Sequence, residues 1–127
     1  MNGHDLDRAN EYWSEEFVQH GPFPGMDVDA EEALETLRLF MEAFPDMQAT
    51  EEFAFTDGEY VCSRYRYSGT HERELMGIEP TDMTVEIYGT VINRIDGGSI
   101  DEAWVNIDLL SLYQQIGAVP DIETLGA

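Results

Sequence analysis

The spacing of apolar residues predicts two helices in the first third of the chain. Over residues 5–19, aromatic side chains such as Trp13 and Phe17 recur at helical spacing, which indicates a first helix. The segment "HGPFPG" ends it, because two prolines and two glycines cannot continue a helix. Residues 29–44 repeat apolar side chains every three or four positions, with Asp29 as a suitable N-cap, and predict a second helix.

From residue 47 onward the apolar period changes from 3.6 to 2, which is typical of β-strands. Residues 48–70 predict two strands joined by an Asp-Gly hairpin turn. Residues 71–82 form a connecting segment, and residues 83–108 predict a long hairpin with its turn at "DGG". A short amphipathic helix follows over residues 109–116. Helices first and an antiparallel sheet afterwards make the predicted fold class α+β.

A chain of 127 residues fits a single domain, 1–127, with a core of about 5–118 and a C-terminal tail at 119–127. No apolar run approaches the roughly 20 residues that a membrane span needs, and the first residues lack the pattern of a signal peptide. We therefore expect a cytoplasmic protein. Cys62 is the only cysteine, which excludes an internal disulfide and a thiolate metal cluster.

The chain is strongly acidic, with 27 Asp and Glu residues against 6 basic residues and a formal net charge of -21. This charge excludes nucleic acid and anionic membranes as partners, because both associations need a basic surface. The acidic residues are scattered along the whole chain. Such scattering favours a halophilic protein, whose acidic surface is adapted to high salt, over an acidic patch for a basic partner.

The last predicted strand presents an unusual mixed face. Alternation places Trp104, Asn106 and Asp108 on one face, and small or branched apolar residues such as Ala103 and Val105 on the other. The apolar face suits packing against helices, and the mixed face suits the wall of a ligand pocket. A carboxylate in such a pocket would be a competent general base. The alternative is that the mixed face is simply the solvated side of a half-buried sheet.

Three further positions are candidates for chemistry. Tyr65 and Tyr67 share a strand face that leads to His71, as in a pocket wall with a polar end, although ordinary aromatic packing explains them equally. His20 follows the first predicted helix, where a cation also interacts favourably with the helix dipole. A facial triad of His20, His71 and Asp108 lacks any recognisable spacing motif, so we expect no metal site.

Four segments of the sequence together resemble one protein family. They are "EYWSEEFVQHGPFPG", "FMEAFPDMQATEE", "GTHERELMGIEPT" and "VINRIDGGSIDEAWVNIDLLSLYQQIG", in the same order over residues 10–118. They resemble the SnoaL-like polyketide cyclases, also called ester cyclases. The resemblance implies a nuclear-transport-factor-2-like (NTF2-like, or cystatin-like) cone, in which a curved antiparallel sheet wraps around N-terminal helices and encloses a deep apolar pocket. It also implies a homodimer and chemistry without a metal or an organic cofactor.

The resemblance also implies roles for particular residues. Asp108 matches the position of the family's general acid/base, and His20 matches a histidine that contributes to the pocket. His20 is then the candidate donor to the enolate, and His71 is expected at the pocket rim or in a structural hydrogen bond. The residues that we expect to bind substrate are Trp104, Asn106, His71, Tyr67, Tyr65, Phe23, Trp13 and Met76.

Two segments depart from the family pattern. The loop "GIEPTDM" replaces the usual Gly-Ile-Pro-Pro-Thr-Gly-Lys, which changes the predicted rim of the pocket. Arg94 stands on the strand where some cyclases carry a histidine. Because a guanidinium does not exchange its proton at neutral pH, Arg94 cannot replace a catalytic histidine there.

Three functions are compatible with this sequence. The first is a cofactor-independent cyclase or isomerase that carries out aldol-type acid/base chemistry on a small apolar or aromatic carbonyl compound. The second is a non-catalytic module of the same fold that binds such a molecule. In that case Asp108 would be held in a salt bridge with Arg64 or Arg94. The third, an epoxide hydrolase, needs an Asp-Arg-Asp arrangement that the sequence does not supply convincingly.

Overall fold

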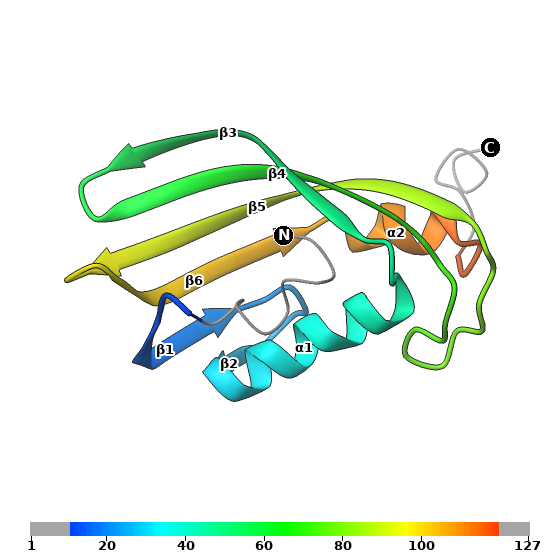
Figure 1. Cartoon of the computed structure of the whole chain (residues 1–127), viewed down its shortest axis with the longest axis horizontal. Coiled ribbons are helices and arrows are strands. Elements are labelled where there is room, and N and C mark those ends of the chain that lie inside the picture. The colour runs from blue at the N-terminus through cyan, green and yellow to red at the C-terminus, as the bar shows by residue number, and fades with distance from the viewer. Residues whose placement is uncertain (1–10, 120–127) are drawn as a thin grey trace.

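The computed structural model describes residues 11–119 as a six-stranded sheet with two helices (Figure 1). The strands follow the order β2-β1-β6-β5-β4-β3 across the sheet. Neighbouring strands are antiparallel except for β1 and β6, which run parallel. In chain order the elements are β1 (Trp13–His20), β2 (Asp27–Asp29), α1 (Ala30–Ala43), β3 (Gln48–Asp57), β4 (Tyr60–Thr70), β5 (Thr84–Asp96), β6 (Ser99–Ile107) and α2 (Leu109–Gln115).

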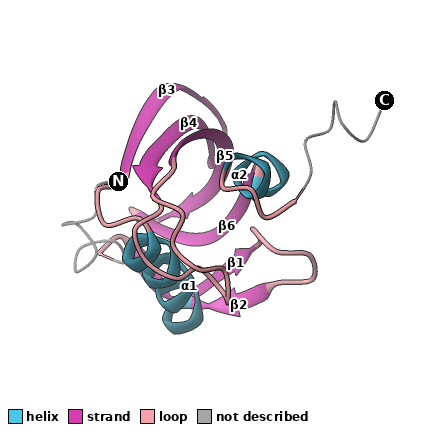
Figure 2. Cartoon of the chain, turned by 90° about the vertical axis from the view of Figure 1, so that its right-hand side faces the viewer, coloured by secondary structure: helices cyan, strands magenta, loops and turns pink. Residues whose placement is uncertain are grey.

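The sheet is strongly curved, and its concave side faces α1 (Figure 2). Helix α1 contacts β1 and β2, whereas α2 contacts β5 near the other end of the sheet. Long, twisted strands such as the 13-residue β5 allow this curvature. The sheet therefore has a concave inner face, toward α1, and a convex outer face.

Two groups of buried side chains hold the helices against the sheet. Phe44 at the end of α1 packs with Leu112 of α2 and Ile87 of β5. Phe17 of β1 packs with Ala33 and Ala103 at the other end. Burying a large apolar side chain contributes about 1.5–3 kcal/mol, so these contacts supply the main attachment of both helices.

The helix predicted for residues 29–44 is confirmed as α1. The Asp29 carboxylate accepts a hydrogen bond of 3.0 Å from the backbone N–H of Glu32, which is an N-cap. The hairpins at Asp57-Gly58 and at residues 96–98, the connection over residues 71–82 and the final helix are also found as expected.

The helix predicted for residues 5–19 is wrong where the structure describes it. Residues 13–20 form strand β1, and residues 5–10 lie outside the described range. A spacing of four places Trp13 and Phe17 on one side of a helix, but it also places them on one face of a strand. Pairing with β6 and stacking of the two rings, whose centroids are 4.2 Å apart, favour the strand.

The α+β, NTF2-like fold class is confirmed, with two corrections to its details. The sheet is mixed, because β1 and β6 are parallel. The expected group of N-terminal helices is also not found in the described part. There, α1 lies against β1 and β2, and the C-terminal helix α2 lies against β5 (Figure 1). Most of the expected tail, residues 120–127, lies outside the described range.

Candidate functional site

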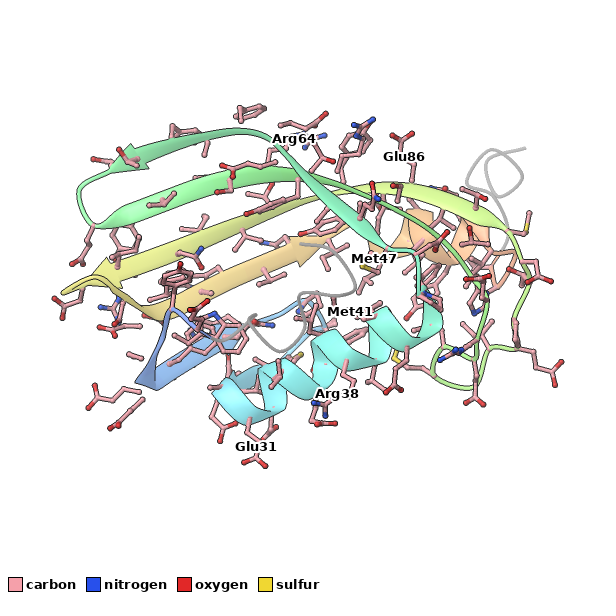
Figure 3. The ribbon with its side chains drawn as sticks, viewed as in Figure 1. Glu31, Arg38, Met41, Met47, Arg64 and Glu86 are labelled. Atoms are coloured by element: carbon pink, nitrogen blue, oxygen red, sulfur yellow. The ribbon has the colours of Figure 1, made fainter. Side chains whose placement is uncertain are left out.

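A cavity of about 410 Å³ lies between the concave side of the sheet and α1. This volume is within the range of ligand pockets in proteins. Its walls are mainly aliphatic and aromatic, and no charged residue lines it among the described residues. Figure 3 shows Met41 on the side of α1 that faces the sheet, whereas Glu31 and Arg38 point away. The sheet contributes Tyr65 and Tyr67 of β4, Val85, Ile87, Val91 and Asn93 of β5, and Ala103, Val105 and Ile107 of β6.

The structure reverses the expected orientation of β6. Ala103 and Val105, from the apolar face, line the large cavity. Trp104 and Asn106 do not, and they lie instead in a second, more open hollow on the other face. The reason is that the cavity occupies the concave side, which is also the side that packs against α1. The apolar face is therefore both the helix-facing and the cavity-facing surface.

Two tyrosines supply the phenol groups of the inner wall. The rings of Tyr65 and Tyr67 stack with centroids 5.8 Å apart on β4. Burial raises the pKa of both phenols above their ordinary value of 10, so both remain protonated hydrogen-bond donors at neutral pH. Tyr65 already interacts with Ser63, whereas Tyr67 forms no side-chain hydrogen bond within the described part of the chain. Tyr67 is thus free to donate to a ligand.

The cavity also contains two amide side chains that sequence analysis missed. Gln19 of β1 and Asn93 of β5 both line it. The signal was present for Asn93, which shares strand parity with Val91 on the inward face of β5. No carboxylate and no imidazole lines this cavity among the described residues. Its polar groups are therefore uncharged donors and acceptors.

Asp108 occupies the N-terminus of α2 and does not line the cavity. Its carboxylate accepts a 3.0 Å hydrogen bond from the backbone N–H of Ser111, and the residue is exposed. The salt bridge expected from Asp108 to Arg64 or Arg94 is replaced by other pairs. Arg64 lies 3.4 Å from Glu52, and Arg94 lies 3.4 Å from Glu102.

His20 lies between two carboxylates on the outer face. Its Nδ1 is 2.5 Å from Asp27 and its Nε2 is 2.6 Å from Glu102. The hydrogen bond to Asp27, followed by that to Glu102, raises the pKa of His20 above its ordinary value of 6.5. In return, the hydrogen bond from His20 lowers the pKa of Glu102, which also contacts Arg94. This chain of charges connects β2, β1, β6 and β5.

The second hollow surrounds this histidine. Trp104 stacks near the His20 ring at a centroid distance of 5.4 Å, and Asn106 also lines the hollow. Phe23 belongs to the loop that borders the hollow, and its ring also stacks against Phe40 of α1 at 6.0 Å. The structure therefore brings four predicted site residues together here, outside the large cavity.

Residues 1–116 match the sequence profile of the SnoaL-like polyketide cyclases. The chain belongs to this family. Among solved structures, it is similar to IdmH from Streptomyces antibioticus, proposed to be a polyketide cyclase, with 31% identity, a TM-score of 0.78 and coverage of 91% of this chain and 89% of that one. AclR from Streptomyces galilaeus, proposed to be a hydroxylase, shares 25% identity, with a TM-score of 0.87 and coverage of 98% and 78%. No curated protein matches the sequence at a significant level.

The remaining predicted residues of this SnoaL-like chain lie in three different environments. Trp13 lines the large cavity. His71 is fully buried beside the Phe44 ring, and its Nδ1 is 3.0 Å from the Thr81 hydroxyl. Met76 is 45% exposed on the connecting segment and does not line the cavity.

The structure does not bring His20, His71 and Asp108 together. His20 lies on the outer face, His71 in the core and Asp108 at the start of α2. Within residues 11–119 no group of three or more His, Cys, Asp or Glu side chains is arranged to hold a metal ion. Neither described helix is long and apolar enough to cross a membrane.

Proposed function

We propose that this SnoaL-like protein binds a neutral, largely apolar carbonyl compound in the large cavity and promotes closure of a ring within it. The observation that carries the proposal is the 410 Å³ apolar cavity with the Tyr65 and Tyr67 phenols in its wall. Family membership supports the ring-closing chemistry. The uncharged lining supports a neutral ligand, because a buried charge without a partner is strongly unfavourable.

The phenol donors in the cavity wall can assist an aldol-type ring closure. The enol carbon of a 1,3-dicarbonyl compound attacks a second carbonyl carbon of the same molecule, and the enol π electrons form the new C–C bond. The attacked oxygen takes a proton from the Tyr67 hydroxyl, which regains a proton from the enol O–H as that oxygen becomes a carbonyl. The cavity contributes by holding the chain folded, and the phenols stabilise the developing negative charge.

A second candidate function is binding without turnover. It is favoured by the absence of a carboxylate or imidazole from the lining of the large cavity among the described residues. The two functions share the same ligand class. They differ in whether a bound 1,3-dicarbonyl compound is recovered unchanged.

The binding step is tested with a neutral fluorescent probe, N-phenyl-1-naphthylamine, and its displacement by 2-acetylnaphthalene. Val91→Trp fills the cavity and should weaken binding at least tenfold, because Val91 lines it. Tyr88→Trp is the matched control on the outer face of the same strand, where Tyr88 is 39% exposed. Equal affinity of both variants and the parent would refute the proposed site.

The ring-closing step is tested with acyclic 1,3,5-triketones, analysed by mass spectrometry and NMR after incubation. We expect formation of a cyclic aldol product faster than in buffer, and a slower rate for Tyr67→Phe even at triketone concentrations that saturate its weakened binding. Recovery of unchanged triketone from a protein that binds it would establish the non-catalytic function instead.

We also propose that two copies associate through the outer face of the sheet. Phe53 and Phe55 on β3 are 57% and 58% exposed there, because they pair with outward-facing residues of β4. In a chain with a net charge of -21, this face carries basic groups that pair with carboxylates. Arg64 lies near Glu52 and Arg66 near Glu86, whereas His20 and Arg94 are shared among Asp27, Asp101 and Glu102. Figure 3 shows Arg64 and Glu86 projecting outward from it.

Light scattering during gel filtration at 1 M NaCl tests this association. The parent should elute as a dimer. The double variant Phe53→Glu, Phe55→Glu should elute as a monomer, because carboxylates replace apolar rings in the proposed interface and repel those of the other copy. Leu39→Glu, at a 47% exposed position on α1, is the control and should remain a dimer. A monomeric parent would overturn the proposal.

A further inference from the structure

Asn93 is a second polar group with an unused hydrogen-bonding capacity in the large cavity. It is half-buried, lines the cavity and forms no side-chain hydrogen bond within the described residues. A half-buried amide without a protein partner is unfavourable in an apolar wall unless water or a ligand satisfies it. The Gln19 amide, in contrast, donates to the backbone oxygen of Gly21 at 3.0 Å.

Asn93 and Tyr67 lie far apart along the cavity. Tyr67 pairs with Ile87 across β4 and β5, and Asn93 is six residues further along β5. At about 3.3 Å per residue, the two positions are separated by at most about 20 Å. Tyr67 is close to the buried core around Ile87, whereas Asn93 shares its end of the cavity with Trp13 and Ile100.

Between these two positions the inward face of β5 is apolar. Gly89 and Val91 occupy the intermediate positions, and Gly89 leaves room for the Tyr67 ring, since an added Cβ would lie 3.0 Å from that ring. Tyr65 lies opposite Gly89 on β4, but its hydroxyl already interacts with Ser63. On β5 the wall therefore has an apolar middle, with the Tyr67 hydroxyl toward one end and the Asn93 amide toward the other. A ligand that matches this wall is elongated and has an apolar middle.

We propose that Asn93 is a specificity-determining residue that selects elongated, neutral ligands with a polar group at each end. The Tyr67 hydroxyl donates to a carbonyl oxygen at the inner end, and the Asn93 amide donates to a second carbonyl at the outer end. The inference rests on the proposed function, because it assigns a ligand shape to the same cavity. It also explains why an amide occupies a position on the inward face of β5 where an aliphatic residue would pack as well.

The test compares linear monoketones with α,ω-diketones of 8 to 14 carbons, by displacement of N-phenyl-1-naphthylamine. At a favoured length, the second carbonyl should strengthen binding about 3- to 10-fold, as one additional neutral hydrogen bond does. Asn93→Leu, which is close in volume, should remove this gain and leave monoketone affinity unchanged. Tyr67→Phe should weaken binding of both compounds.

Asn106→Leu is the matched control, since Asn106 is an exposed amide outside the large cavity. It should leave both affinities unchanged. Suppose that monoketones bind to the parent and not to Val91→Trp. The inference is then overturned, and the proposed function stands, if the second carbonyl does not strengthen binding or if Asn93→Leu keeps the gain in affinity. If Val91→Trp has no effect on binding, the proposed function itself fails. Asn93→Ala provides a second variant should Asn93→Leu unfold.

Discussion

Asp108 and His20, the two residues expected to be catalytic, both form structural contacts in the folded protein. The Asp108 carboxylate is engaged with the backbone of α2, and the His20 imidazole with two carboxylates of neighbouring strands. The family resemblance implies a functional role for both positions, but neither side chain lines the large cavity. Substitutions at each position can therefore show whether the side chain contributes to stability, to catalysis, or to both.

Two replacements of Asp108 distinguish the effect of its N-cap on stability from the effect of its negative charge. Asp108→Ala should lower the free energy of unfolding by about 1 kcal/mol, because it removes an N-cap, whereas Asp108→Asn should leave it nearly unchanged, because Asn caps equally well. Urea denaturation measures both values, and probe binding should be unaffected in either variant. Loss of turnover in Asp108→Asn at unchanged stability would instead support the acid/base role that the family resemblance implies.

The protonation of His20 should make stability depend on pH. Because the pKa of His20 is raised in the folded protein, its contribution is fully present below pH 6.5 and is lost as pH rises through the raised value. The difference in free energy of unfolding between the parent and His20→Gln should therefore be larger at pH 6 than at pH 9. Urea denaturation at fixed ionic strength measures it, and a difference independent of pH would contradict the assignment.

At the level of elements, the loop between β1 and β2 determines how the N-terminal hairpin meets the rest of the sheet. Gly21 has φ +85° and lies against the backbone of β6, where an added Cβ would be 2.2 Å from the Val105 oxygen. Pro22, the next residue, borders both hollows. Close approach at Gly21 thus allows β1 to pair with β6 and to complete the cavity wall.

Substitution of two glycines in this loop tests that close approach. Gly21→Ala should destabilise the protein by about 2–4 kcal/mol, because strain from the positive φ is combined with overlap against β6 backbone. Gly25→Ala is the control, since Gly25 has φ +72° but nothing within 4 Å of an added Cβ, and should cost about 1 kcal/mol. Equal losses in thermal or urea denaturation would show that Val105 does not restrict Gly21.

For the whole molecule, charge is the dominant property. A net charge of -21 produces repulsion that opposes the compact state, and salt screens it over about 10 Å at 0.1 M and about 3 Å at 1 M. The described lining of the large cavity contains no charged residue, and Arg64, Arg66 and Arg94 pair with carboxylates on the outer face. Because 6 basic residues cannot neutralise 27 acidic ones, repulsion between carboxylates remains over the rest of the surface.

Salt should therefore stabilise the fold. We expect the melting temperature to rise between 0.05 and 2 M NaCl, with loss of secondary structure by circular dichroism on dilution into low salt. A variant with Glu42→Gln, Glu72→Gln and Glu79→Gln, at exposed positions, should show a weaker dependence on salt. Full secondary structure at low salt would contradict the prediction of a halophilic protein.

The sequence by itself determined the elements whose signals are local. Helix α1 has an N-cap and a clear apolar period, and the hairpins carry Asp-Gly turns. The SnoaL-like family also followed from motifs in the chain. Alternation correctly placed Tyr65 and Tyr67 on one face of β4, because the period of a strand is a property of its own backbone.

Only the tertiary structure decided which face of each strand is inside. Alternation separates Trp104 from Val105, but the curvature of the whole sheet makes the Val105 face concave. Strand β1 required pairing with β6, and the contact of His20 with Glu102 joins residues 82 positions apart. Such contacts depend on how distant segments pack, and therefore no local period can predict them.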